Sequence, residues 1–282
     1  MVSISGNQTQ QDGDNKGGII MSREAYLNSF STIYEEIKQS VETKIGKLQS
    51  KSVNPNFIDR YYDMLANDYC IIGIGEITLN NDFIAAKKYF YQAAKLQEVL
   101  FQRYDSKEMK ISSAFVTMNK YNRLLLALLS DSEELTSSLA HLIGGRTREE
   151  KDHGHPFSDN VGYAVKYIIL DEKEKALENI ENLKKLESNK DIKPYIAYRI
   201  VLNGIIERNV DSINDGLNLM VENHKRNKTF DDTADELISI PTIGFSKLSE
   251  MKGLKISLDD AIAPYAIMKK DIIAYPNLEF LL

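Results

Sequence analysis

Apolar residues recur every three or four positions along most of the chain, which is the spacing of one face of an α-helix. In residues 22–49, Tyr26, Phe30 and Ile37 fall on one stripe, while glutamates and lysines fall mostly outside it. Residues 82–104 repeat the pattern, with small alanines beside large aromatic side chains. Both stretches therefore predict amphipathic helices.

The same periodicity predicts helices along most of the remaining chain. They are expected at residues 56–79, 109–129, 132–143, 156–170, 173–186, 193–208, 211–223, 231–237 and 241–253. The run CIIGIGEITL (residues 70–79) would suit a strand by itself, but its place between two helices favours a helix whose glycines allow close packing. Short turns between successive helices favour antiparallel hairpins. We expect an all-α fold in a tetratricopeptide-like or α-solenoid arrangement.

Polar stretches predict how the chain is divided. Residues 1–20 are rich in Gly, Asn and Gln and lack the pattern of a signal peptide, so they are expected to form a disordered tail. Met21 could be a downstream start, because the helical pattern begins only there. The longest later interruption, GGRTREEKDHGH at residues 144–155, predicts an exposed loop between an N-terminal lobe (21–143) and a C-terminal lobe (156–282).

Charge and composition narrow the choice of partner. The formal net charge is -6, which disfavours nonspecific binding to nucleic acid and suits a basic protein or peptide. No apolar run approaches the ~18 residues of a membrane span, so we expect a cytoplasmic protein without a membrane partner.

Few residues in the sequence are candidates for catalysis or metal binding. Asp152, His153 and His155 are the nearest approach to a metal cluster, but the HExxH and CxxC spacings of zinc sites are missing, which favours a solvated polar loop. GIGE at residues 73–76 lacks the Lys-Ser/Thr ending of a phosphate-binding loop. We therefore expect no catalytic residues, metal or cofactor. An enzyme that uses the three residues of the polar loop remains the weakest alternative.

Exposed aromatic and acidic residues are the candidates for binding a partner. Tyr195 and Tyr198 offer apolar area together with a hydroxyl group, which suits protein interfaces. The acidic candidates are Asp231, Asp232, Asp235, Glu236, Asp259 and Asp260. They could steer a basic partner, although helix capping and solvated surfaces explain them equally well.

Two C-terminal segments carry a resemblance to a known family. IIERNVDSINDGLNLMVENHKRN (205–227), then an acidic stretch, then PTIGFSKLSEMKGLKISLDDAIAP (241–264) resemble the ending of the Imm49 family of bacterial immunity proteins. AAKKYFYQAAKLQE (85–98) and NVGYAVKYIILDEKEKA (160–176) also fit the family pattern.

The resemblance implies a protein that is encoded beside a polymorphic toxin and neutralises it by stoichiometric occlusion in the cytoplasm. The expected partner is then a cognate toxin, basic in character. The alternative is a tetratricopeptide-like adaptor or peptide-responsive regulator. That alternative predicts a concave groove, lined by Asn, Lys or Tyr, that binds short peptides.

Overall fold

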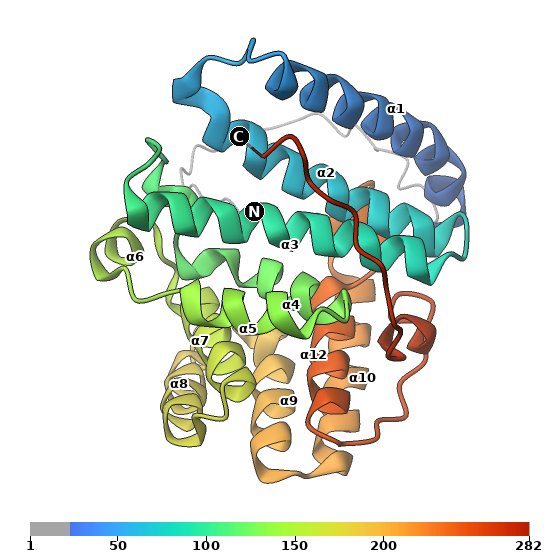
Figure 1. Ribbon diagram of the computed structural model, residues 1–282. Coiled ribbons are helices and arrows are strands. Elements are labelled where there is room, and N and C mark those ends of the chain that lie inside the picture. The colour runs from blue at the N-terminus through green and yellow to red at the C-terminus, as the bar shows by residue number, and fades with distance from the viewer. Residues whose placement is uncertain (1–22, 282) are drawn as a thin grey trace, which may run out of the picture.

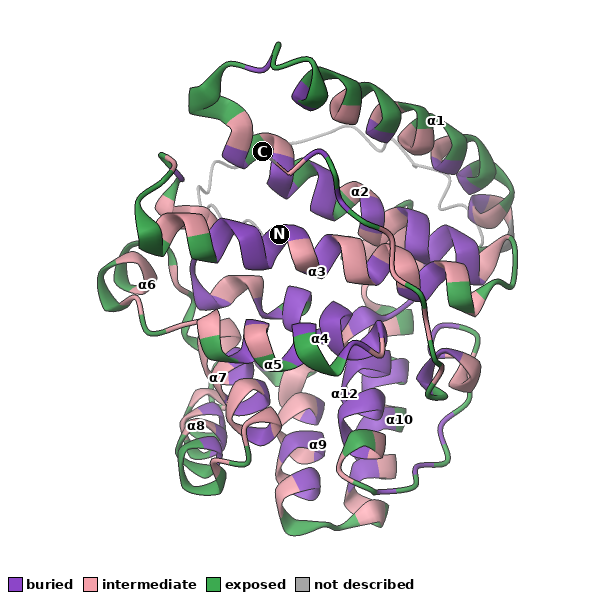
Figure 2. Cartoon of the chain, viewed as in Figure 1, coloured by how far each residue is buried: buried purple, intermediate pink, exposed green. Residues whose placement is uncertain are grey.

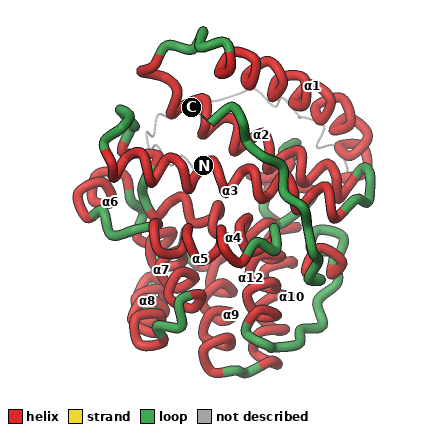
Figure 3. Tube along the Cα trace, viewed as in Figure 1, coloured by secondary structure: helices red, strands yellow, loops and turns green. Residues whose placement is uncertain are grey.

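The computed structural model describes residues 23–281, and these residues form an all-α protein (Figures 1 and 3). The described part of the chain contains α-helices and short 3₁₀ helices, and no β-strand. This confirms the predicted fold class. The expected tail at residues 1–20 and the possible start at Met21 lie outside the described residues.

Helices follow one another along the described chain. In its first half lie α1 (Arg23–Gln49), α2 (Ile58–Thr78), α3 (Phe83–Ser106), α4 (Tyr121–Leu129) and α5 (Glu133–Leu142). In its second half lie α6 (Thr147–His153), α7 (Pro156–Ile169), α8 (Lys173–Leu186), α9 (Ile196–Glu207), α10 (Val210–Arg226), α11 (Ala234–Leu237) and α12 (Ile240–Met251). The 3₁₀ helices are η1 (Pro55–Phe57), η2 (Ser113–Phe115), η3 (Met118–Lys120), η4 (Lys193–Tyr195), η5 (Lys228–Phe230) and η6 (Tyr265–Met268).

Several helix ends are fixed by capping residues. The Asp82 carboxylate accepts a hydrogen bond from the backbone N–H of Ala85 at 2.9 Å and so caps α3. Ser132 caps α5 in the same way. Gly253 follows α12 with φ = 73°, a left-handed conformation that glycine adopts without steric cost.

The helix expected at residues 109–129 is wrong in its first half, where the chain forms η2 and η3 before α4 begins. Side chains of other helices hold this backbone in place. The Asp59 carboxylate accepts from the N–H of Ser112 at 2.8 Å, and the Gln97 amide donates to the carbonyl of Phe115 at 2.8 Å. These bonds replace the intrahelical ones that a continuous helix would need.

The polar stretch 144–155 is not wholly a loop, because it contains α6. Two tyrosine hydroxyls hold this helix: Tyr104 donates to Glu149 at 2.6 Å, and Tyr163 donates to Glu150 at 2.8 Å. The two glutamates also lie in the first turn, where the helix dipole favours negative charge. The charged residues that predicted a loop therefore stabilise a short helix.

The acidic helix expected at residues 231–237 is shorter than predicted, since α11 begins only at Ala234. Asp232 has φ = 58°, and the N–H of Thr233 donates to the carbonyl of Phe230 at 3.0 Å. This turn conformation is incompatible with a right-handed helix.

Successive helices pack as antiparallel hairpins. Helices α1, α2 and α3 lie side by side, and α7–α8 and α9–α10 form two further pairs. In Figure 1, the lower helices α7 to α10 and α12 run roughly perpendicular to the α1–α3 layer. Buried apolar side chains from both halves belong to one cluster. Figure 2 shows buried positions on the helices of both halves. The division into lobes at 21–143 and 156–282 stays a prediction.

Two glycines of α2 allow its neighbours to approach closely, as the run CIIGIGEITL predicted. A Cβ atom added to Gly73 would lie 2.4 Å from Cε1 of Phe90 on α3. One added to Gly75 would lie 2.2 Å from Cδ2 of Tyr34 on α1. A single helix thus contacts aromatic rings on both sides through positions that lack a side chain.

A buried cluster of charges joins distant parts of the chain. The Lys87 ammonium group on α3 is fully buried and donates to Asp131 Oδ2 at 2.6 Å and to Asp271 Oδ2 at 2.7 Å. Asp131, in the α4–α5 turn, also forms an ion pair with Lys247 of α12. The four side chains therefore connect α3, the α4–α5 turn, α12 and the C-terminal segment.

That C-terminal segment has no regular structure and crosses α3 on the near side of Figure 1. The ring of Tyr275 stacks on that of Tyr91 with a centroid distance of 4.2 Å, and its hydroxyl donates to the carbonyl of Ser130 at 2.7 Å. Leu278 and Phe280 are buried. These contacts pack the segment onto the helices, and its two buried side chains belong to the core.

Replacing Gly75 by Ala is expected to destabilise the protein by about 1–3 kcal/mol, because the new methyl group collides with the Tyr34 ring. Gly46 on α1 is the matched control, since nothing lies within 4 Å of an added Cβ there. Gly46→Ala should stabilise by about 0.5–1 kcal/mol through helix propensity. Urea unfolding followed by circular dichroism measures both changes. A Gly75→Ala protein as stable as the wild type would contradict the close contact.

Candidate protein-binding cleft

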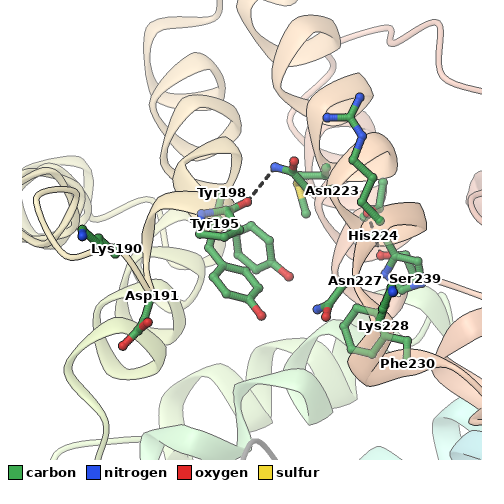
Figure 4. Close-up of a pocket in the computed structure, with 14 residues that line it drawn as sticks. Lys190, Asp191, Tyr195, Tyr198, Asn223, His224, Asn227, Lys228, Phe230 and Ser239 are labelled. Carbon is green, nitrogen blue, oxygen red and sulfur yellow. Dashed lines mark hydrogen bonds between the residues drawn. The ribbon is translucent and has the colours of Figure 1, made fainter. Parts of the chain in front are cut away.

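A cleft of about 570 Å³ opens where α9 begins, α10 ends and α12 begins (Figure 4). The turn before η4 closes one end, and η5 closes the other. Each wall therefore comes from a helix end, where one hairpin meets the next.

Tyr195 and Tyr198, both proposed from the sequence, form one wall of the cleft. Phe157 of α7 supports both rings, with centroid distances of 5.4 and 5.7 Å. Phe245 of α12 meets the Tyr198 ring edge-on at 5.3 Å. Burial raises the pKa of Tyr198 well above the ordinary value, so its hydroxyl stays protonated. The rings are held rigidly and can offer hydroxyl donors.

The opposite wall comes from the end of α10 and from η5. The Asn223 amide donates across the cleft to the carbonyl of Pro194 at 2.6 Å, the dashed line in Figure 4. His224 stacks on Phe230 at 4.5 Å, and its Nε2 lies 2.6 Å from the carbonyl oxygen of Asp235. Burial lowers the pKa of His224, so the ring is neutral near pH 7 and donates from Nε2. These contacts fix the width of the cleft.

The sequence did not identify this second wall. Asn223, His224 and Phe230 carry no signal by themselves. The signal that could have found them is the run ENHKRNKTF at residues 222–230, where a basic helix end continues into an aromatic residue.

The six acidic candidates lie on two segments that follow α10 and α12. Glu236 accepts from the N–H of Asp232 at 2.8 Å, and Asp259 accepts from the N–H of Tyr265 at 2.9 Å. Asp260 pairs with Lys225 at 2.7 Å. Glu236, Asp259 and Asp260 thus stabilise turns or ion pairs of this chain. The remaining three candidates, Asp231, Asp232 and Asp235, are wholly or partly exposed.

Asp152, His153 and His155 lie on α6 and in the turn after it. His153 Nε2 lies 2.9 Å from the hydroxyl of Ser113. Within residues 23–281, no group of three or more His, Cys, Asp or Glu side chains has an arrangement suited to a metal ion. The side chain of His153 thus contacts η2.

Comparison of the chain with protein-family models, curated proteins and solved structures finds no match. Separately, none of the helices between residues 23 and 281 has the length and apolar character that a bilayer crossing requires.

Asp159 on α7 provides a test of pH dependence near α6. Burial, and then the nearby charge of Glu150, raise the pKa of Asp159 from 3.8 to about 6. The folded protein therefore holds this proton more tightly than the unfolded chain does. Stability attributable to Asp159 is greatest below pH 3.8 and falls as the pH rises to about 6.

Asp159→Asn is therefore expected to stabilise the protein at pH 7 by less than about 1 kcal/mol, since partial exposure screens the charge. The difference from the wild type should vanish near pH 4, where the Asp159 carboxyl group is protonated. Urea unfolding across this pH range measures the effect, with exposed Asp152→Asn as control. Equal pH profiles for the wild type and Asp159→Asn would contradict the assignment.

Proposed function

We propose that this chain is an immunity protein that binds one cognate toxin and blocks it by stoichiometric occlusion. The observation that carries the proposal is the position of the segments that resemble the Imm49 family. Residues 205–227 form the end of α9 and all of α10, and residues 241–264 form most of α12 and the segment after it. These segments border the cleft that holds Tyr195 and Tyr198.

Occlusion needs a rigid surface with a few strong anchors. Tyr195 and Tyr198 have the packing of such anchors, because Phe157 fixes both rings before any partner arrives. Asp231, Asp232 and Asp235, together with the net charge of -6, support a partner that is basic overall. These charges mainly accelerate encounter, while the anchors slow dissociation. Binding of this kind requires no metal or cofactor, and its place would be the cytoplasm.

A second function, that of a tetratricopeptide-like adaptor for short peptides, is favoured by the composition of the cleft. That alternative predicted a groove lined by Asn, Lys or Tyr. The cleft contains Tyr195, Asn223, Asn227 and Lys228. The two functions differ in the number of partners, since an immunity protein has one tight partner and an adaptor has several weak ones.

Co-expression with the product of the neighbouring gene tests the proposal. The wild-type protein should restore growth and should purify with the toxin as a 1:1 complex. Tyr195→Ala should raise the dissociation constant about 30-fold, the loss typical of a central aromatic anchor. Isothermal titration calorimetry measures the change.

Tyr61→Ala is the matched control, because Tyr61 is partly buried on α2 and does not line the cleft. It should leave the dissociation constant unchanged. A non-toxic neighbouring product, or toxicity that persists beside this protein, would refute the proposal.

A further inference from the structure

The cleft carries a charge opposite to that of the whole chain. Three cationic side chains line it (Lys190, Arg226 and Lys228), together with one carboxylate, Asp191. The chain as a whole has a net charge of -6. A local reversal of sign in a concave site selects ligands of the opposite charge.

Two of these cations are not explained by contacts within the chain. Arg226 belongs to the last turn of α10, where positive charge suits the helix dipole, and it lies 3.3 Å from Glu222. Lys190 lies in the turn after α8, and Lys228 lies in η5. Among residues 23–281, neither of these lysines forms an ion pair.

The aromatic wall adds hydrogen-bond donors. Figure 4 shows the rings of Tyr195 and Tyr198 extending from the start of α9 towards the side of the cleft formed by η5. In the described part of the chain, neither hydroxyl makes a hydrogen bond. Phenol hydroxyls and ammonium groups together form short, charge-assisted hydrogen bonds with carboxylates.

The partner's side chain must also match the apolar surface of the cleft. The rings of Tyr195, Tyr198 and Phe230 can pack against an aromatic side chain, for which the volume of about 570 Å³ leaves room. Asp231 and Asp232 follow directly after Phe230, so a long acidic stretch would be repelled beyond that end. The acidic motif that fits is therefore short.

We infer that the cleft binds a short segment of the partner protein in which an aromatic residue is flanked by carboxylates. Lys190 and Lys228 pair with the carboxylates, the two tyrosine hydroxyls donate to them, and the aromatic ring enters between Tyr198 and Phe230. This inference rests on the proposed function only for the identity of the partner. A partner that is basic overall would use this acidic motif to fix its orientation.

The test is an NMR titration of the full chain with a seven-residue capped peptide that has Asp-Phe-Asp at its centre. We expect a dissociation constant below about 1 mM, a strength of binding that chemical-shift changes can resolve. The changes should include the side-chain amides of Asn223 and Asn227. Peptides with Lys-Phe-Lys or Asp-Ala-Asp at the centre should bind at least tenfold more weakly.

Paired variants separate the charge of the cleft from the charge of the whole protein. Lys190→Glu with Lys228→Glu should weaken peptide binding at least tenfold. Lys110→Glu with Lys173→Glu makes the same change in net charge at exposed positions outside the cleft and should leave binding intact. Tyr195→Phe with Tyr198→Phe removes only the hydroxyls and should weaken binding several-fold.

Equal binding of the Lys-Phe-Lys peptide, shift changes away from the cleft, or no binding at 5 mM peptide (roughly five times the expected limit) would overturn the inference. The titration uses no toxin, and the co-expression test uses no peptide. Failure of the peptide titration therefore leaves the inhibitor proposal standing, and failure of the growth test leaves the peptide site standing.

Discussion

The arrangement of the helices depends on the ion pairs of the buried Lys87 ammonium group. A charge removed from water is tolerated only when partners surround it, and Lys87 has Asp131, Asp271 and the carbonyl of Lys269. Asp131 also forms an ion pair with Lys247. The backbone of Asp131 has φ = 64°. Two lysines and two aspartates thus balance one another. No one of them can be removed without leaving a charge uncompensated.

This cluster positions the cleft through α12. Lys247 joins α12 to the α4–α5 turn, and Gly244 on the same helix allows Leu125 of α4 to approach closely. Phe245 then contacts Tyr198, so the rings that line the cleft rest on a helix held by the cluster. Because that support exists before a partner binds, little conformational entropy would be lost in ordering the cleft.

The sequence predicted most of the helices because their apolar stripes are local patterns. It failed where distant side chains decide the local structure. The backbone at Ser112 is bound by Asp59 of α2, and α6 is stabilised by Tyr104 and Tyr163. None of these three contacts is visible from spacing along the chain.

The candidate cleft was predicted only in part, for the same reason. Tyr195 and Tyr198 could be found because tyrosine, with its apolar ring and its hydroxyl group, is typical of protein interfaces. Asn223 and Lys228 become relevant only when α10 and η5 lie opposite those tyrosines. The burial of Lys87 could not be predicted either, since its carboxylate partners lie 44 and 184 residues away in sequence.

The free energy of unfolding of the Lys87→Met variant is the most direct test of the role of the buried charge cluster. Lys88→Met on the same helix is the control. Met fills the space of the lysine stem but leaves two carboxylates facing one remaining lysine. We expect a loss of about 3–5 kcal/mol and faster amide hydrogen exchange in α12 and in residues 269–281. The control should change neither quantity. A loss below about 1 kcal/mol, with exchange in α12 unchanged, would contradict the central role of the cluster.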